Sequence, residues 1–147
     1  MVSQLTFEIV AAPKDGTTGA NLITTLTALD MGERAKTVVV ADVECNGNRT
    51  WVDQPPFDTA IAELIRYASA VGQFDWGSFF FFRHLPPVTI AAKDYAWLFA
   101  AADLVVRAVD DMYFYVYSPS VDDVAKVARF FPVECNERQR DDIAHPF

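Results

Sequence analysis

The sequence has few of the residues that build metal sites. Its 147 residues include two cysteines, Cys45 and Cys135, and two histidines, His84 and His145, and no two of these four are close neighbours in the chain. Structural zinc sites are usually built from closely spaced ligand pairs. The sequence therefore predicts no metal site, and it contains no motif that indicates a cofactor.

Long apolar runs are also missing. No segment approaches the 18 or more apolar residues that a membrane-spanning helix requires. The first basic residue is Lys14, so the N-terminus lacks the charged-then-apolar order of a signal peptide. Without a secretory signal, two cysteines do not indicate disulfides. We therefore expect a cytoplasmic protein with no membrane partner.

Basic residues are scarce. Twelve lysines and arginines stand against twenty acidic residues, which gives a formal net charge of -8. Proteins that bind nucleic acids need clustered basic side chains to contact phosphates, and here even Arg138 and Arg140 have acidic neighbours. Nucleic acid is therefore not expected as a partner. A negative surface favours solubility, and it would also speed encounter with a basic protein.

The composition is that of a folded protein. Hydrophobic residues make up 52% of the chain and charged residues 22%, which excludes a disordered or low-complexity segment. The length suits one hydrophobic core. We predict a single α+β domain over residues 1–147, with a polar and partly mobile tail over 136–147.

Hydrophobic periodicity predicts about five strands and four helices. The expected strands are 5–11, 37–45, 48–52, 78–82 and 112–117, and the expected helices are 20–31, 58–68, 91–109 and 120–131. The first six elements follow the βαββαβ order of a ferredoxin-like unit, which places helices on one face of a mainly antiparallel sheet.

Two local patterns carry much of this prediction. Asn46-Gly47 lies between two β-type runs and predicts a tight hairpin, because both turn positions require positive φ. The segment 91–109 is apolar on nearly every side, which is typical of a central helix. Such a helix could cover the second face of the sheet.

Aromatic residues are abundant, at 14% of the chain. In the segment 112–117, Tyr113, Tyr115 and Tyr117 alternate with apolar residues, so a strand here carries three phenols on one face. Trp51 and Trp76 are expected on loops or strand edges. These five residues form either a recognition surface, which tyrosine and tryptophan favour, or a second covered face of the sheet.

The sequence shows no catalytic constellation, so we predict a non-enzymatic protein-binding domain, such as an inhibitor, an immunity-type protein or an adaptor. Its partner would be another protein, possibly basic, and a homo-oligomer is also possible. The alternative is a module that binds a small anion or nucleotide, or an enzyme. It would use the glycine-rich loop Gly16–Gly19 at a helix N-terminus together with His84 or Cys45.

Overall fold

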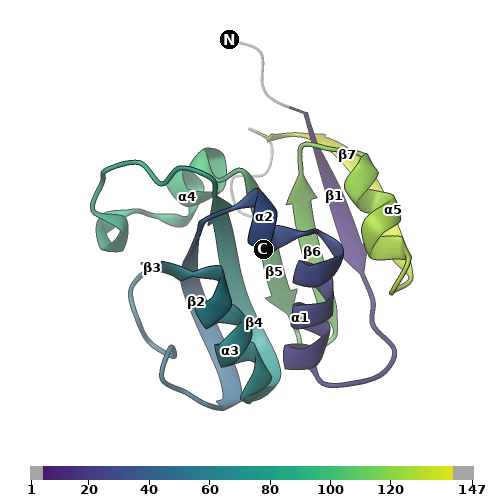
Figure 1. Cartoon of the computed structure of the whole chain (residues 1–147), viewed down its shortest axis with the longest axis horizontal. Helices are drawn as coiled ribbons and strands as arrows, with labels where there is room; N and C mark the ends of the chain where they lie inside the picture. Colours follow the sequence, from purple (N-terminus) through teal and green to yellow (C-terminus); the bar gives the residue numbers. More distant parts are fainter. Residues whose placement is uncertain (1–4, 141–147) are drawn as a thin grey trace.

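A seven-stranded antiparallel sheet forms the centre of the computed structural model, which describes residues 5–140 (Figure 1). The strands are β1 Leu5–Ala11, β2 Thr37–Gly47, β3 Phe57–Ala60, β4 Val71–Phe82, β5 Leu104–Val109, β6 Tyr113–Ser118 and β7 Val133–Gln139. The helices are α1 Thr18–Ala28, α2 Met31–Arg34, α3 Ile61–Ser69, α4 Tyr95–Ala101 and α5 Asp122–Ala128, and the 3-10 turn η1 spans Ile90–Ala92. Across the sheet the strands follow the order β3-β2-β4-β5-β6-β1-β7.

The mixed α+β class and the antiparallel sheet are confirmed, but the described part of the chain has seven strands and five helices instead of five and four. The ferredoxin-like start is present only as an order along the chain. In space the β5–β6 pair separates β1 from β4, and β2 pairs with β3 and β4. The crossover formed by α1 and α2 therefore carries the chain past three strands before β2 begins.

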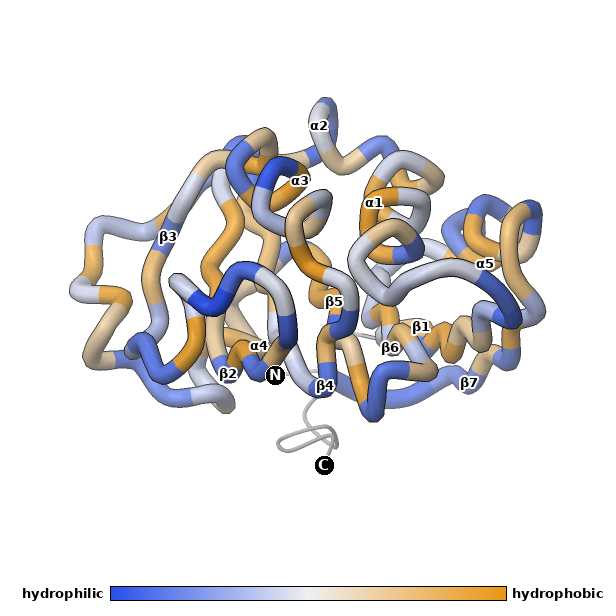
Figure 2. Tube along the Cα trace, turned by 90° about the horizontal axis from the view of Figure 1, so that it is seen from below, coloured by the Kyte–Doolittle hydropathy of each residue, from blue (hydrophilic) through white to orange (hydrophobic). Residues whose placement is uncertain are grey.

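The helices cover the two faces of the sheet unequally (Figure 2). The first face packs against α1, α2, α3 and α5, whose buried side chains include Leu22, Met31, Leu64 and Val127. Within residues 5–140, the second face packs against α4 and η1 alone, through Leu98, Phe99 and Ile90 over Phe80 and Val105. Each fully buried apolar side chain of this kind contributes about 1.5–3 kcal/mol to folding.

The predicted helix over 91–109 is wrong. Asp94 caps the short helix α4 by accepting a hydrogen bond from the Trp97 amide (2.9 Å), and the chain then forms β5. All six residues of β5 are buried, because β4 and β6 flank it and both faces of the sheet are covered there. A strand with two covered faces is apolar on every side, so its pattern resembles that of a buried helix.

The predicted hairpin at Asn46-Gly47 is also wrong. Gly47 has the expected positive φ of 84°, but it still belongs to β2 and lies opposite Val71 of β4. The Asn46 side chain contacts the neighbouring strand β4, where its oxygen accepts a hydrogen bond from the backbone N–H of Gln73 at 2.8 Å. The returning strand is β3, which pairs with the start of β2, and α3 begins only at Ile61.

Two further predictions need correction at their ends. The strand expected at 78–82 is the second half of β4, which begins at Val71. The polar tail expected from residue 136 starts later, because β7 continues to Gln139 and pairs with β1. This edge strand is too polar for periodicity to detect. The rest of the predicted tail, residues 141–147, lies outside the described residues, as does His145.

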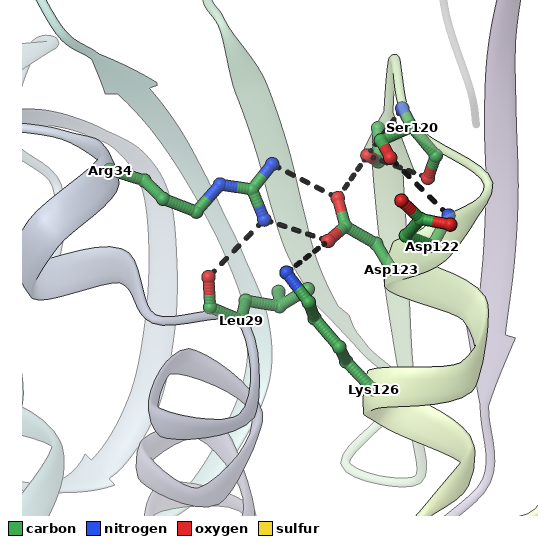
Figure 3. Close-up of polar contacts among 7 residues, drawn as sticks. Leu29, Arg34, Ser120, Asp122, Asp123 and Lys126 are labelled. Carbon is green, nitrogen blue, oxygen red and sulfur yellow. Dashed lines mark hydrogen bonds and ion pairs between the residues drawn. The ribbon is translucent and has the colours of Figure 1, made fainter.

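A buried carboxylate joins the first helix layer to the sheet (Figure 3). Asp123 of α5 is 1% exposed and accepts two hydrogen bonds from Arg34 of α2, at 2.8 and 3.0 Å. The Ser118 hydroxyl at the end of β6 donates to the same carboxylate, and the Lys126 Nζ lies 3.5 Å away. Burial by itself raises the pKa of Asp123, but the Arg34 and Ser118 hydrogen bonds outweigh burial and lower it.

We expect Asp123→Asn to lower the free energy of unfolding by about 2 kcal/mol at pH 7, the scale of hydrogen bonds to a charged group. A carboxyl whose pKa is lowered by folding stabilises the protein above its unfolded pKa of about 3.9, and this contribution disappears as the pH falls through the folded value. The difference from wild type should therefore shrink below about pH 4 in urea unfolding curves. Asp122→Asn, an exposed neighbour in the same turn, is the control. A difference that stays constant down to pH 2.5 would contradict this account.

Candidate binding surface

The strand register places the tyrosines of β6 on the second face of the sheet. Tyr113 lies opposite Val109, which lies opposite Trp76 of β4. In the next row along the strands, Tyr115 lies opposite Arg107. The following row contains Tyr117 and Val105, and these pack with α4 in the second core.

Burial divides the tyrosine stripe of β6, which consists of Tyr113, Tyr115 and Tyr117, into two parts. Tyr117 is completely buried, and its ring meets Phe99 of α4 edge to face, with 4.9 Å between centroids. Tyr113 and Tyr115 are half-buried, and Trp76 is 38% exposed. Tyr117 is therefore a core residue that a partner cannot reach. We call the remaining three residues, Trp76, Tyr113 and Tyr115, the aromatic surface.

The structure does not bring Trp51 to the aromatic surface. Its ring stacks on Tyr67 of α3 at 3.9 Å and 7°, and its edge contacts Phe57. Its backbone N–H donates to the Tyr67 hydroxyl at 3.3 Å, and that hydroxyl donates to the Asn48 carbonyl. Burial raises the pKa of Tyr67 to about 12. Trp51 thus holds the loop between β2 and β3 against α3.

A buried arginine that was not among the predicted site residues lies next to the aromatic surface. Arg107 is 7% exposed, its Nε donates to Ser78 Oγ at 3.1 Å, and its guanidinium lies over the Tyr95 ring, 4.9 Å from the centroid. Burial lowers the pKa of Arg107, while the nearby carboxylate of Asp42 opposes that shift. Such a cation supports the rings around it through cation–π attraction. In the sequence, the feature that could have identified Arg107 is that it is the single arginine within the apolar run of β5.

The phenols of Tyr95 and Tyr117, which lie next to Arg107, remain protonated at neutral pH. Burial raises the pKa of Tyr95 and of Tyr117, and in Tyr117 the nearby charge of Glu8 adds to this effect. A phenol with a raised pKa cannot act as a general base or a nucleophile at pH 7. These groups can pack and donate hydrogen bonds.

Acidic side chains flank the aromatic surface on both sides. Glu44 of β2 lies opposite Trp76, and Asp42 precedes it in a β-bulge with a left-handed φ of 54°. On the other side, Glu134 of β7 lies opposite Val10, which lies opposite Tyr115. A bulge redirects side chains locally, and aspartate tolerates its conformation better than most residues. The open part of this face is therefore aromatic in the middle and charged at its edges, where Glu44 is paired with Arg49 at 2.8 Å and where Asp42 and Glu134 are acidic.

The loop Gly16–Gly19 already binds a carboxylate of this chain, that of Asp111. The Thr17 side chain caps α1 by accepting from the Ala20 amide at 3.2 Å, and the Thr18 hydroxyl donates to the Asp111 carboxylate. A side chain at Gly19 would come within 2.2 Å of the Val71 carbonyl oxygen. The positive end of α1 thus has a carboxylate beside its first turn, where the helix dipole favours one.

Neither Cys45 nor His84 joins that loop. Cys45 is 1% exposed, with its Sγ 3.5 Å from the Tyr67 hydroxyl. His84 follows the last residue of β4, whereas Gly19 packs against Val71 at the first residue of that strand, so the two lie at opposite ends of the sheet. His84 lines a separate cavity of about 510 Å³. The lining also includes Arg34, Arg83, Asp103 and Arg140.

The two cysteines lie on β2 and β7, separated in the sheet by four strands.

The chain matches no protein-family model, no curated protein and no solved structure. Within residues 5–140, no helix is both long and apolar enough to cross a membrane. The same residues contain no cluster of three or more histidine, cysteine or acidic side chains that could hold a metal ion. What the fold and its surface define is an α+β domain whose sheet has one covered and one half-covered face.

The division of the tyrosine stripe can be tested by stability. We expect Tyr117→Ala to lower the free energy of unfolding by about 3–5 kcal/mol, because it removes a fully buried aromatic ring. Tyr113→Ala should cost about 1 kcal/mol or less, as for a surface position. Equilibrium unfolding in urea measures both. Equal losses in the two variants would show that the whole stripe is core.

Proposed function

We propose that this domain binds a protein with a basic surface through the aromatic surface formed by Trp76, Tyr113 and Tyr115. The observation that carries the proposal is the half-open second face of the sheet. Its three partly exposed aromatic side chains project from a rigid sheet, and Glu44 and Glu134 flank them. Tyrosine and tryptophan on a rigid support lose little entropy on binding, and they dominate the energy of many interfaces.

Charge supports a basic partner. The net charge is -8, and the basic side chain nearest the centre of this surface, Arg107, is buried among rings. Opposed charges at the edges of an interface raise the association rate and exclude partners of the wrong sign. The protonated phenols and the buried guanidinium favour recognition over catalysis. An inhibitor, an immunity-type protein or an adaptor would act in this way, by occupying a basic surface of its target.

The proposal predicts that binding and stability separate in the double variant Tyr113→Ala/Tyr115→Ala. We expect its affinity for the partner to fall by about 30-fold or more, the scale of a hot-spot loss near 2 kcal/mol. Its melting temperature should stay within a few degrees of wild type. Tagged full-length chain would capture the partner from the source cells, and calorimetry with the purified partner would give both affinities.

Ile65→Ala is the matched control. Ile65 is 37% exposed, almost the same as Trp76, but it lies on α3 over the first face of the sheet. This variant should bind like wild type. If the double variant also binds like wild type, or if it loses most of its stability, the aromatic surface is not the interface.

The cavity beside His84 supports a second candidate function, the binding of a small anion. Arg83 and Arg34, the latter paired with Asp123, line its wall near the end of β4, and the Arg83 Nε donates to the Arg34 carbonyl at 3.5 Å. Asp103 opposes this positive charge and accepts from the Arg83 amide at 2.7 Å. A volume of about 510 Å³ lies in the range of small-molecule sites.

Under this second candidate function, inorganic phosphate or pyrophosphate should raise the melting temperature at constant ionic strength, because a ligand stabilises the state that binds it. The shift should disappear in His84→Ala/Arg83→Ala and persist in Arg129→Ala, an exposed arginine at the end of α5. Equal shifts in all three proteins would indicate general salt effects and exclude the site. Loss of this response would leave the protein-binding proposal untouched.

A further inference from the structure

The strand β7 ends the sheet and presents a long unpaired edge. It pairs with β1 on one side, and within residues 5–140 no strand pairs with its other side. Five of its seven residues are exposed, and the opposite edge strand, β3, is only four residues long. A free edge of this length is a template for another strand, because its outward N–H and C=O groups lack strand partners.

The sequence of β7 is complementary to itself in one register. When two copies of a strand pair antiparallel about a two-fold axis normal to the sheet, facing residues share a face. The axis therefore lies between the two copies of one residue, which face each other, and that residue defines the register. With the axis at Asn136, all seven residues overlap, and each Glu134 faces an Arg138. With the axis at Glu137, two glutamates would face each other. An axis at Cys135 shortens the overlap and leaves Glu134 facing an asparagine.

Two of the three charged side chains of β7, Glu134 and Arg138, already lie on the same face. Glu134 and Arg138 follow the alternation of the strand, opposite Val10 and Thr6 of β1. Arg138 contacts Glu8 through one nitrogen, with Nη1 to Oε2 at 3.1 Å, and its side chain is 38% exposed. A guanidinium has five N–H donors, so it can bind Glu8 and a second carboxylate at once.

We propose that β7 pairs antiparallel with β7 of a second copy of this chain, with the two-fold axis at Asn136. The pairing continues the sheet across both copies, and each Glu134 meets the Arg138 of the other copy. The pairing does not involve Trp76, Tyr113 or Tyr115, although it uses Glu134, which flanks the aromatic surface. The axis is normal to the sheet, so both aromatic surfaces lie on the same side of the dimer and can engage a repetitive or dimeric target.

Charged residues on an edge strand usually prevent it from pairing with another strand. Cross-linking tests whether the charged residues of β7 prevent such pairing or promote pairing with a second copy of the chain. The variant Asn136→Cys, in a Cys135→Ser background, places two thiols directly opposite each other, with Cβ atoms about 5 Å apart. A short bis-maleimide should then give a covalent dimer in high yield. The control is Asp58→Cys in the same background, at an exposed site on the other edge strand, β3. Equal cross-linking of the two variants, or none, would overturn the proposal.

Charge reversal tests the register. Glu134→Arg should raise the dimer dissociation constant at least tenfold, since attraction becomes repulsion at two symmetric positions. Size-exclusion chromatography with light scattering measures this change. Mixing this variant with Arg138→Glu should restore a heterodimer, because every facing pair is again Arg–Glu. A wild type that is monomeric at every concentration, or a Glu134→Arg variant that dimerises normally, contradicts the proposal. If Arg138→Glu fails to fold because Glu8 loses its partner, the cross-linking result decides.

Discussion

The unequal covering of the two faces of the sheet is the constraint on which the rest of this structure depends. In the described part of the chain, four helices cover the first face, and one short helix with a 3-10 turn covers part of the second. The strands near α4 are therefore buried on both faces, and the phenylalanine-rich end of β4 belongs to both cores. Where α4 no longer reaches, the same strands carry half-exposed aromatic side chains above a fixed backbone.

The interior of the second face sets the chemistry of that aromatic surface. Arg107 is held by Ser78 and by the ring of Tyr95, and burial keeps the neighbouring phenols protonated. A surface built over such a layer is preorganised, so little ordering entropy opposes binding. On the first face, the Arg34–Asp123 pair performs a structural task by holding α2 and α5 in one layer over the sheet.

The sequence predicted those parts of the fold in which one residue pattern has one physical meaning. Alternation gave β1 and the tyrosine strand β6, and amphipathic spacing gave α1 and α3. The prediction failed where two structures share a pattern. A strand buried on both faces, β5, resembles a helix, and the positive φ of Gly47 occurs here in a continuing strand instead of a hairpin turn. The polar edge strand β7 has no hydrophobic signal at all.

The candidate surface was predictable only in part, for the same reason. Three alternating tyrosines identified a face of the sheet. Which end of that face α4 covers depends on contacts between segments that are distant in the sequence. Tyr117 therefore belongs to the core while Tyr113 does not. Trp51 and Trp76 look alike in sequence, yet one stacks on α3 and the other lies beside the tyrosines. Arg107 has no motif, because its role arises from its neighbours.

Hydroxyl-radical footprinting of the free and the partner-bound chain, read by mass spectrometry, tests the central claim most directly. In the free protein we expect Trp76, Tyr113 and Tyr115 to be oxidised readily and Tyr117 and Phe80 to be protected. In the complex the first three should become protected as well, while Ile65 and Phe130 keep their reactivity. Protection of all three tyrosines in the free chain, or unchanged oxidation of Trp76 and Tyr115 in the complex, would contradict the account.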